Sequence, residues 1–480
     1  IWPRPTSKAN PTGNELVKIQ QNHIFDQKTD AVGFVWTQVS KDSILWNMRK
    51  RFATIAVMAS IISGLAFGVS VGQKTQTPNS FDSFPMLDAY YDEDVSSEQE
   101  GFWAKCRIFL VTIGEGDPLY SWFGHTALLV ESPSNPSYMF DYGTFSFDAD
   151  NFYRNFIMGR LWFCCNVSYG DYELPYLGTT GRKVSKVELN LTPFQKKAII
   201  SFLNENSKAD NRTYLYHHYN DNCATRVRDI ISYATDGDFE VWAKAKEGLS
   251  FRKRASGALS RNRFVQWALE FLQSGQIDGK ATAWEEMFLP ELLERYVFEY
   301  GLETGLVSSD GYELVYEQTL ESAGGRGSQP SPNYAFSIIL GASLAAIAFA
   351  LLWFSQRPSV LLTYRIYSFA VDLVLGIFGS VLMFMVFFTN HNVTWCNENL
   401  LFVNPLLFAM AIKSLGIKAS SSDKAKRLSV WYKGLLCVMA MLVVLKVALP
   451  GVFLQDNWTV IIAMAPYYAV NAFLLGRERR

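Results

Sequence analysis

The sequence predicts an α+β domain followed by an all-α transmembrane bundle of about five segments. Three observations lead to this prediction. Between residues 102 and 326, short apolar runs bounded by turn residues are mixed with helical patterns, which is typical of an α+β fold. Between residues 334 and 476, apolar runs dominate, and most of them are long enough to cross a bilayer. Lysine and arginine residues fall in alternate loops between those runs.

The first hundred residues divide into three parts. Residues 1–47 are polar and lack periodicity, and we interpret them as a non-native upstream extension. Residues 48–72 begin with Met48 and three basic residues before an apolar run, which predicts a signal peptide or an N-terminal anchor. Residues 73–101 are acidic and polar, as expected of a linker. The formal net charge of the whole chain is −1, so the composition does not indicate a nucleic-acid partner.

Turn residues and apolar runs predict the elements of the soluble domain, residues 102–326, in order. We expect the strand 126–130 to turn back through the loop 132–136 into the strand 138–143, so that the two pair antiparallel. A Thr-Pro pair at 192–193 is a helix start signal. The expected strands are 106–113, 126–130, 138–143 and 184–191, and the expected helices are 152–158, 193–204, 223–234 and most of the chain from there to about residue 300.

His125 and Cys223 form the most informative pair of residues. His125 opens the second strand, and Cys223 opens a helical pattern. A thiol in the first turn of a helix lies near the positive end of the dipole, which favours the thiolate, and a histidine at a strand end can act as its base. Taken singly, a buried cysteine and a loop histidine would be ordinary. In papain-like proteases the cysteine precedes the histidine, so the reverse order indicates a circularly permuted version of that site.

Three further residues are candidates for the same site. Asp141 lies on the returning strand, where it would hold the imidazole tautomer of His125, or else hydrogen-bond a loop. Asn222 would contribute a polar group or a backbone conformation to an oxyanion hole, or cap the helix. Tyr219, together with Tyr214, Tyr216, His217 and His218, would line the cleft or form a half-buried aromatic strand or loop.

Cations and cysteines give fewer indications. Arg160, Arg182 and Arg228 would contact a phosphate head group or form salt bridges. The six cysteines give no pattern of disulfides, although Cys106, Cys164 and Cys165 leave a pairing open. Because no spacing of metal-ligand type occurs, we expect no metal and no cofactor.

Five motifs follow one another along the soluble domain: Gly124-His125-Thr126-Ala127-Leu128, Asp141-Tyr142-Gly143-Thr144-Phe145, Gly181-Arg182, Leu189-Asn190-Leu191-Thr192 and Asn222-Cys223-Ala224-Thr225. Over about residues 103–300 they resemble the Lnb-type N-terminal periplasmic domain. The resemblance implies a circularly permuted papain-like fold, related in plan to NlpC-type hydrolases and to lecithin retinol acyltransferase. It also implies that Cys223 is the nucleophile and His125 the base.

The resemblance implies a reaction as well. Lnb proteins are bacterial lipoprotein N-acyltransferases, so the expected reaction moves a fatty acyl chain from a phospholipid donor to the α-amine of a lipoprotein's N-terminal diacylglyceryl cysteine. A periplasmic cysteine amidase or peptidase that acts on cell-wall peptide is the main alternative, and a non-enzymatic envelope scaffold is another. Several membrane spans favour the lipid substrate, because a hydrolase would need only one anchor.

The membrane domain, residues 334–476, sets the topology. Its basic residues lie after the first and third segments and at the C-terminus, whereas loops 389–398 and 450–457 contain no Lys or Arg. This asymmetry predicts a multi-pass protein of the bacterial inner membrane with its catalytic domain in the periplasm. The expected segments are 334–354, 366–388, 399–412, 431–449 and 458–475.

Polar residues of the membrane domain carry three further expectations. Segment 399–412 is short and contains Pro405, so it spans thinly, extends into its neighbours or is re-entrant. His391 and Trp395, in the periplasmic loop, would contact lipid head groups or the incoming lipoprotein, or else cap the helix pair. Asp372 and Lys446 lie in membrane segments at different depths, and we do not expect them to pair.

Overall fold

The computed structural model describes residues 97–133, 135–319, 327–418 and 422–475. The predicted upstream extension, the signal or anchor segment and most of the predicted linker lie outside these residues. Helix α3 (Ser97–Lys105) begins inside the stretch predicted as linker. All described residues belong to one compact unit, which begins at Asp94.

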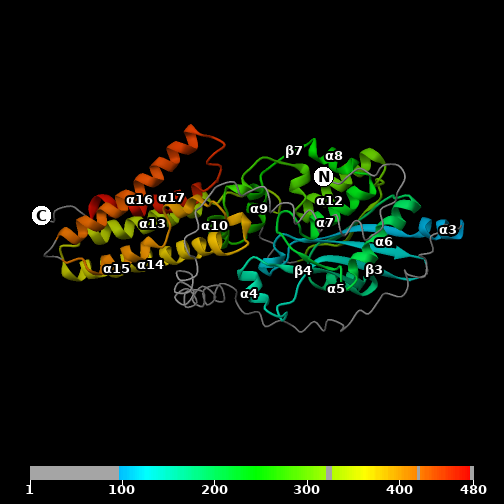
Figure 1. Cartoon of the computed structure of the whole chain (residues 1–480), viewed down its shortest axis with the longest axis horizontal. Coiled ribbons are helices and arrows are strands. Elements are labelled where there is room, and N and C mark those ends of the chain that lie inside the picture. Colours follow the sequence, from blue (N-terminus) through cyan, green and yellow to red (C-terminus); the bar gives the residue numbers. More distant parts are fainter. Residues whose placement is uncertain (1–96, 134, 320–326, 419–421, 476–480) are drawn as a thin grey trace, which may run out of the picture. The chain divides into compact units, whose positions relative to one another are not determined.

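An α+β domain forms the first part of this unit, around a seven-stranded antiparallel sheet with the order β6-β4-β3-β2-β1-β5-β9 (Figure 1). The predicted antiparallel pairing of the second and third strands is confirmed, with Ala127 opposite Asp141. Strands β4 and β9 were not expected from the sequence, and β6 begins the aromatic segment for which a strand or a loop was expected. The strands are β1 (Arg107–Ile113), β2 (His125–Ser132), β3 (Asn135–Thr144), β4 (Trp162–Tyr169), β5 (Val184–Glu188), β6 (Thr213–Leu215) and β9 (Tyr312–Tyr316).

Helices cover both faces of this sheet, so the inner strand β1 is buried from Ile108 to Ile113. One core cluster joins Phe109 and Val111 to Leu177 of α5 (Gly170–Thr179), while α7 (Cys223–Ala234) packs against β2 and β3. The remaining helices are α4 (Phe152–Ile157), α6 (Pro193–Ser207), α8 (Asp238–Lys244), α9 (Phe251–Leu259), α10 (Arg263–Leu272), α11 (Ala283–Glu286) and α12 (Pro290–Thr304). A two-stranded ribbon, β7 (Glu247–Gly248) and β8 (Ala281–Thr282), lies outside the main sheet.

Local sequence signals explain where two of the predicted helices begin. The Thr192 hydroxyl accepts a hydrogen bond from the backbone N–H of Gln195, and the side-chain oxygen of Gln195 accepts one from the backbone N–H of Thr192, with Pro193 at the first helical position of α6. Asn222 caps α7 in the same way. Because these caps satisfy backbone groups that the helix leaves free, they fix the residue at which each helix starts.

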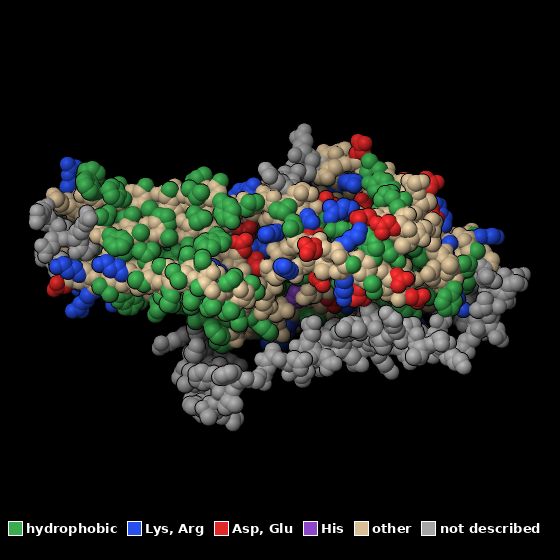
Figure 2. Space-filling model, turned by 90° about the horizontal axis from the view of Figure 1, so that it is seen from above, with side chains coloured by type: hydrophobic (Ala, Val, Ile, Leu, Met, Phe, Trp, Pro, Cys, Tyr) green, Lys and Arg blue, Asp and Glu red, His purple; other side chains and the backbone are tan. Residues whose placement is uncertain are grey.

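The second part is helical and apolar. Its helices are α13 (Tyr334–Trp353), α14 (Pro358–Phe388), α15 (Leu406–Leu415), α16 (Ser422–Ala448) and α17 (Trp458–Leu474), with short 3₁₀ turns η4 (Asn392–Thr394) and η5 (Glu398–Leu401). Among the described residues, four helical segments are long and apolar enough to cross a membrane, and α17 is a shorter apolar helix. Figure 2 shows this domain covered by hydrophobic side chains, with Lys and Arg side chains gathered at one end.

The third membrane segment is longer than expected, running from Glu398 to Leu415 as η5 followed by α15. Of the three alternatives, extension into neighbouring residues agrees with this helix. Its irregular middle packs closely on α14: a β-carbon on Gly379 would stand 2.5 Å from the Cα of Asn404. A residue without a side chain is therefore needed at this crossing.

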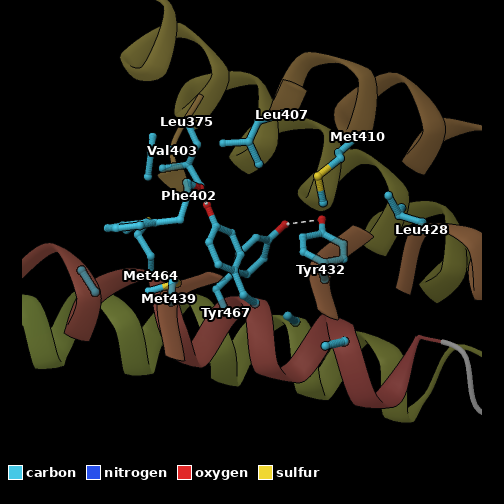
Figure 3. Close-up of a cluster of buried hydrophobic side chains, with 14 of the residues drawn as sticks. Leu375, Phe402, Val403, Leu407, Met410, Leu428, Tyr432, Met439, Met464 and Tyr467 are labelled. Carbon is cyan, nitrogen blue, oxygen red and sulfur yellow. Dashed lines mark hydrogen bonds between the residues drawn. The ribbon is translucent and has the colours of Figure 1, made fainter. Parts of the chain in front are cut away.

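Asp372 is fully buried in α14 and is surrounded by hydroxyl donors. Its carboxylate accepts hydrogen bonds from Tyr432 at 2.6 Å and from Tyr467 at 3.2 Å. The two phenol oxygens lie 3.3 Å apart among apolar side chains such as Leu407 (Figure 3). Lys446 instead pairs with Glu398 and donates to a backbone carbonyl. The two intramembrane charges thus have separate partners, as expected.

Candidate active site

His125 and Asp141 meet at the end of the β2–β3 hairpin. Side chains alternate along a strand, and Ala127 pairs with Asp141, so His125 and Asp141 project from the same face of the sheet. The Nε2 atom of His125 lies 2.5 Å from Oδ1 of Asp141. The approach of the two residues that we predicted from the hairpin is present in the structure.

Cys223 occupies the first position of α7, directly after the N-cap residue Asn222. The Oδ1 atom of Asn222 accepts from the backbone N–H groups of Ala224 and Thr225, both at 2.9 Å. Its amide nitrogen donates to the carbonyls of His218, at 2.7 Å, and Phe288, at 2.9 Å. The side chain of Asn222 therefore caps the helix, which is one of the two roles expected for it. Its amide group donates to protein carbonyls and so holds the segment before Cys223 in place.

Gly143 is the point at which the hairpin meets α7. A β-carbon on this residue would stand 3.6 Å from Cβ of Cys223 and 3.6 Å from a ring carbon of Tyr216. Its φ of 91° is one that residues with a side chain rarely adopt. Glycine at this position thus lets Cys223 approach the strand end that carries Asp141.

The charges of this site favour a protonated histidine. Burial disfavours the charged imidazole, but the charges of Asp141 and Cys223, and the hydrogen bonds from both, raise the pKa of His125 well above its usual value. Because Nε2 faces Asp141, Nδ1 is the nitrogen left for the thiol. Burial, with the charge of Asp141, also raises the pKa of Glu173, a nearby residue of α5 that the sequence did not single out.

The aromatic residues before Cys223 fall into two groups, one near the thiol and one in a buried aromatic cluster. Tyr216 lies beside Cys223, where burial and the charge of Cys223 raise the pKa of the phenol. Tyr219 is buried, accepts a hydrogen bond from Gln273 at 2.9 Å and packs against Phe288, so it belongs to an aromatic cluster. His218 joins that cluster, and burial lowers its pKa to about 4.

Two of the three candidate arginines, Arg228 and Arg182, donate hydrogen bonds to backbone carbonyls of the same domain. Arg228 stacks on Trp284 and bonds its backbone carbonyl, which makes it structural. Arg182 donates to the carbonyl of Gly114 at 2.8 Å, but its Nη2 atom is buried and has no hydrogen-bond partner among the described residues. Burial lowers the pKa of Arg182, against the charges of Tyr120, Cys223 and Asp141, so its guanidinium lies within electrostatic range of the candidate nucleophile.

The loop 389–397 of the membrane domain contacts the α+β domain directly. His391 bonds the carbonyl of Phe156 at 3.0 Å, and Asn392 bonds His217 at 2.8 Å. Trp395 is 42% exposed. His391 is thus engaged between the two parts of the protein, whereas Trp395 keeps a free face.

A pocket of about 280 Å³ lies behind the strand ends and is lined by Ile113, Gly124 and Pro290 among others. Neither His125 nor Cys223 lines it, so we do not count it as part of the candidate site. All six cysteines are free thiols. In the residues that the structure describes, no group of three His, Cys, Asp or Glu side chains is placed to hold a metal ion.

This arrangement supplies the parts of nucleophilic thiol chemistry. A cysteine lies at the positive end of a helix, beside a histidine that a carboxylate orients. The same constellation performs acyl transfer and hydrolysis on unrelated folds, so the geometry alone leaves the substrate open.

Two family models match the chain, one in each of its two parts. Residues 103–255 match the Lnb N-terminal periplasmic domain, and residues 330–475 match the Lnb transmembrane domain. No curated protein and no solved structure matches the chain. The first part of the chain is therefore a periplasmic domain, and the second is a multi-span transmembrane domain.

Proposed function

The chain belongs to the Lnb family, and from this premise we propose that it is a lipoprotein N-acyltransferase with a cysteine nucleophile. It takes a fatty acyl chain from a phospholipid and transfers it to the α-amine of a lipoprotein's N-terminal diacylglyceryl cysteine. The observation that carries this proposal is the Cys223–His125–Asp141 arrangement in a periplasmic domain that is followed by a multi-span domain. We also propose that the domain has a circularly permuted papain-like fold, because the strand with His125 precedes the helix with Cys223.

The first half-reaction forms a thioester. His125 takes the proton of Cys223, and the thiolate sulfur attacks the ester carbonyl carbon of the phospholipid. The tetrahedral intermediate collapses by breaking the carbon–oxygen bond of the ester. His125 returns its proton to the departing oxygen, which leaves as a lysophospholipid.

The second half-reaction forms the amide. The neutral amine of the lipoprotein attacks the thioester carbonyl, and His125 accepts a proton from the attacking nitrogen. The carbon–sulfur bond then breaks, which regenerates the thiolate beside a protonated imidazole. Asp141 remains a carboxylate throughout and stabilises the imidazolium.

Backbone and side-chain donors next to the thiol stabilise the developing charges. Ala224 and Thr225 donate to Asn222, which leaves the backbone N–H of Cys223 as the first-turn donor for the oxyanion. Arg182 offers a buried guanidinium nitrogen near the site, and we assign it to the phosphate of the donor head group.

Mass spectrometry of lipoprotein N-termini tests the proposal. Cells with this protein should carry an N-acylated diacylglyceryl cysteine, and cells with the Cys223→Ala variant should carry a free amine. Diacylated lipoproteins in both strains would contradict the proposal. If the purified protein instead cleaved cell-wall peptide, the cysteine amidase or peptidase would become the correct assignment.

A further inference from the structure

The helix α4 and the chain on either side of it form an exposed apolar surface on the periplasmic domain. No residue of α4 is buried, and Tyr153 and Phe156 are 66% and 43% exposed. Soluble domains rarely expose a contiguous apolar area of this kind without a partner. We call it the α4 surface, and its other large apolar members are Phe147, Ile157 and Trp162.

The α4 surface lies against the loop that leaves the membrane helix α14. The backbone N–H of Asn390 donates to the carbonyl of Met158 at 2.8 Å, and His391 bonds the carbonyl of Phe156. A β-carbon on Gly159 would stand 2.7 Å from the backbone nitrogen of His391, so only glycine permits this approach. The hydrogen bonds place α4 at the end of a candidate membrane span.

Exposed apolar side chains continue from that span onto α4. The last two residues of α14, Phe387 and Phe388, are 68% and 40% exposed. They lie at the end of a helix whose composition suits the interior of a bilayer. The α4 surface is therefore continuous with a face that lipid would cover, which favours lipid over a protein partner.

The charges around α4 also suit the surface of a bilayer. Two carboxylates, Asp148 and Asp150, and two guanidinium groups, Arg154 and Arg160, are exposed near its ends. Their formal charges cancel. Short helices with aromatic side chains on one face and charges at the edges lie in the membrane interface, held mainly by apolar burial.

A row of aromatic rings connects the α4 surface to Cys223. Tyr216 and Cys223 both lie against Gly143, since a β-carbon on that glycine would stand 3.6 Å from each of them. The ring centroid of Tyr216 is 4.6 Å from that of Phe163. Phe163 stacks on Phe145 at 4.7 Å. The row continues from Phe145 to Phe152 at 5.6 Å and from Phe152 to Phe156 at 6.1 Å.

We propose that the α4 surface inserts into the outer face of the bilayer, and that the row of rings guides an acyl chain of a membrane phospholipid to Cys223. The second half of this inference rests on the proposed function, because it needs Cys223 to accept the acyl group. An acyl chain that leaves the bilayer requires apolar contacts along its whole path. The rings provide such contacts between the membrane end of the domain and the thiol.

Photo-crosslinking in the full-length protein tests the insertion without any turnover. A benzophenone amino acid replaces Tyr153 in the Cys223→Ser variant, which is reconstituted in phosphatidylcholine vesicles with radiolabelled acyl chains. We expect a labelled lipid adduct. The matched control replaces Tyr172, a tyrosine of α5 that is 78% exposed, and we expect no adduct above background there. Equal labelling at both positions, or a crosslinked dimer or foreign protein at position 153, would overturn the proposal.

A kinetic test addresses the path of the acyl chain. The Tyr153→Ser/Phe156→Ser double variant should raise KM for a vesicle-borne donor about tenfold, since two aromatic side chains no longer enter the bilayer. Alkylation of Cys223 by a small water-soluble reagent should not change, and Tyr172→Ser should behave as the unmodified protein. An unchanged KM would overturn the path. Lipid adducts at position 153 together with no acyl transfer by the unmodified protein would preserve the insertion and refute the proposed function instead.

Discussion

Gly143 lies directly against Cys223: a β-carbon on the glycine would stand 3.6 Å from Cβ of the cysteine. This contact brings the end of β3 and the start of α7 to the distance that the candidate nucleophile needs. The glycine also has a φ of 91°, a conformation that residues with a side chain rarely adopt, so the backbone conformation rather than a lack of space favours glycine here. The motif Asp141-Tyr142-Gly143 thus supplies two different parts of one site.

Gly143→Ala should lower acyl transfer up to about a hundredfold, because relief of the strained left-handed backbone would shift the strand end beside Cys223, and a misplacement of about 1 Å at a reacting group costs about that much. The left-handed backbone alone costs about 1–2 kcal/mol. Gly237→Ala is the matched control, since Gly237 has a φ of 87° with no atom within 4 Å of its β-carbon position. Both variants should lose similar stability, and only the first should lose activity. Equal activity in the two would show that the contact with Cys223 has no catalytic consequence.

Cys223→Ser should abolish acyl transfer and leave the protein folded, because the substitution is nearly isosteric and a serine hydroxyl beside histidine is a weaker nucleophile. Intact-protein mass spectrometry with a phospholipid donor should detect an acyl adduct on the unmodified chain only. Cys437→Ser changes an exposed cysteine of α16 and should retain the adduct. An adduct that forms on the Cys223→Ser variant at the wild-type rate would remove Cys223 from the nucleophile role.

The pH dependence of alkylation by iodoacetate should report His125. Protonated His125 attracts the carboxylate of the reagent, so the rate should fall when His125 loses its proton, well above the usual histidine range. The charge of Asp141 raises the pKa of His125, so Asp141→Asn should move this alkaline decline to lower pH, by about 1–3 units. Glu173→Gln removes a nearby carboxylate that does not bond the imidazole, so this variant should shift the alkaline decline less than Asp141→Asn does. A decline at the same pH in all three proteins would show that Asp141 does not raise the pKa of His125.

Hairpin and capping signals account for the parts of the site that could be predicted. The turn at 132–136 brought Asp141 back beside the strand of His125, and the position of Asn222 before a helical pattern placed Cys223 in the first turn. Strand β4 does not stand out in the sequence although its buried residues Phe163, Cys165 and Val167 alternate, because Trp162 and Cys164 on the opposite face are apolar too and break the alternation of apolar with polar residues. Strand β9 is mostly exposed at the sheet edge and carries no burial signal.

The contact between the two domains could not be predicted for a different physical reason. Many of its hydrogen bonds use backbone groups, such as the N–H of Asn390 and the carbonyl of Met158. Backbone groups are the same in every residue, so side-chain patterns do not reveal which of them will pair. His391 was expected to contact lipid head groups or the incoming lipoprotein, or to cap the helix pair, and the structure places its ring against the carbonyl of Phe156.

Asp372→Leu should destabilise the membrane domain, because Tyr432 and Tyr467 would lose their buried acceptor. Hydrogen bonds inside membrane proteins contribute about 0.6–1.7 kcal/mol each, so the loss should be about 1–3 kcal/mol. Asp372→Asn keeps an acceptor oxygen and should lose less. Thermal unfolding in detergent ranks the stability of the three proteins. A leucine variant at least as stable as the unmodified protein would show that these hydrogen bonds do not stabilise the membrane domain.

The membrane domain should hold the end of α10 in place as well as anchor the chain. The amide of Asn397 donates to the carbonyls of Phe271 and Leu272 at 3.1 and 3.0 Å, and the next residue, Gln273, reaches Tyr219. These carbonyls end a helix and have no partner within it.

Asn397→Ala leaves the carbonyl of Leu272 without this partner, at a cost of about 1–3 kcal/mol for a buried group, whereas the carbonyl of Phe271 still accepts from the amide of Asn399 at 2.9 Å. Hydrogen exchange over residues 269–277 should therefore accelerate in the full-length variant, and acyl transfer should fall. The control Asn190→Ala, which removes only a long contact to Gly305, should change neither.

Residues 73–326 on a single foreign anchor lack all of these contacts and should fail to N-acylate lipoproteins. Normal N-acylation by that singly anchored domain would mean that the helices α13–α17 serve only as an anchor.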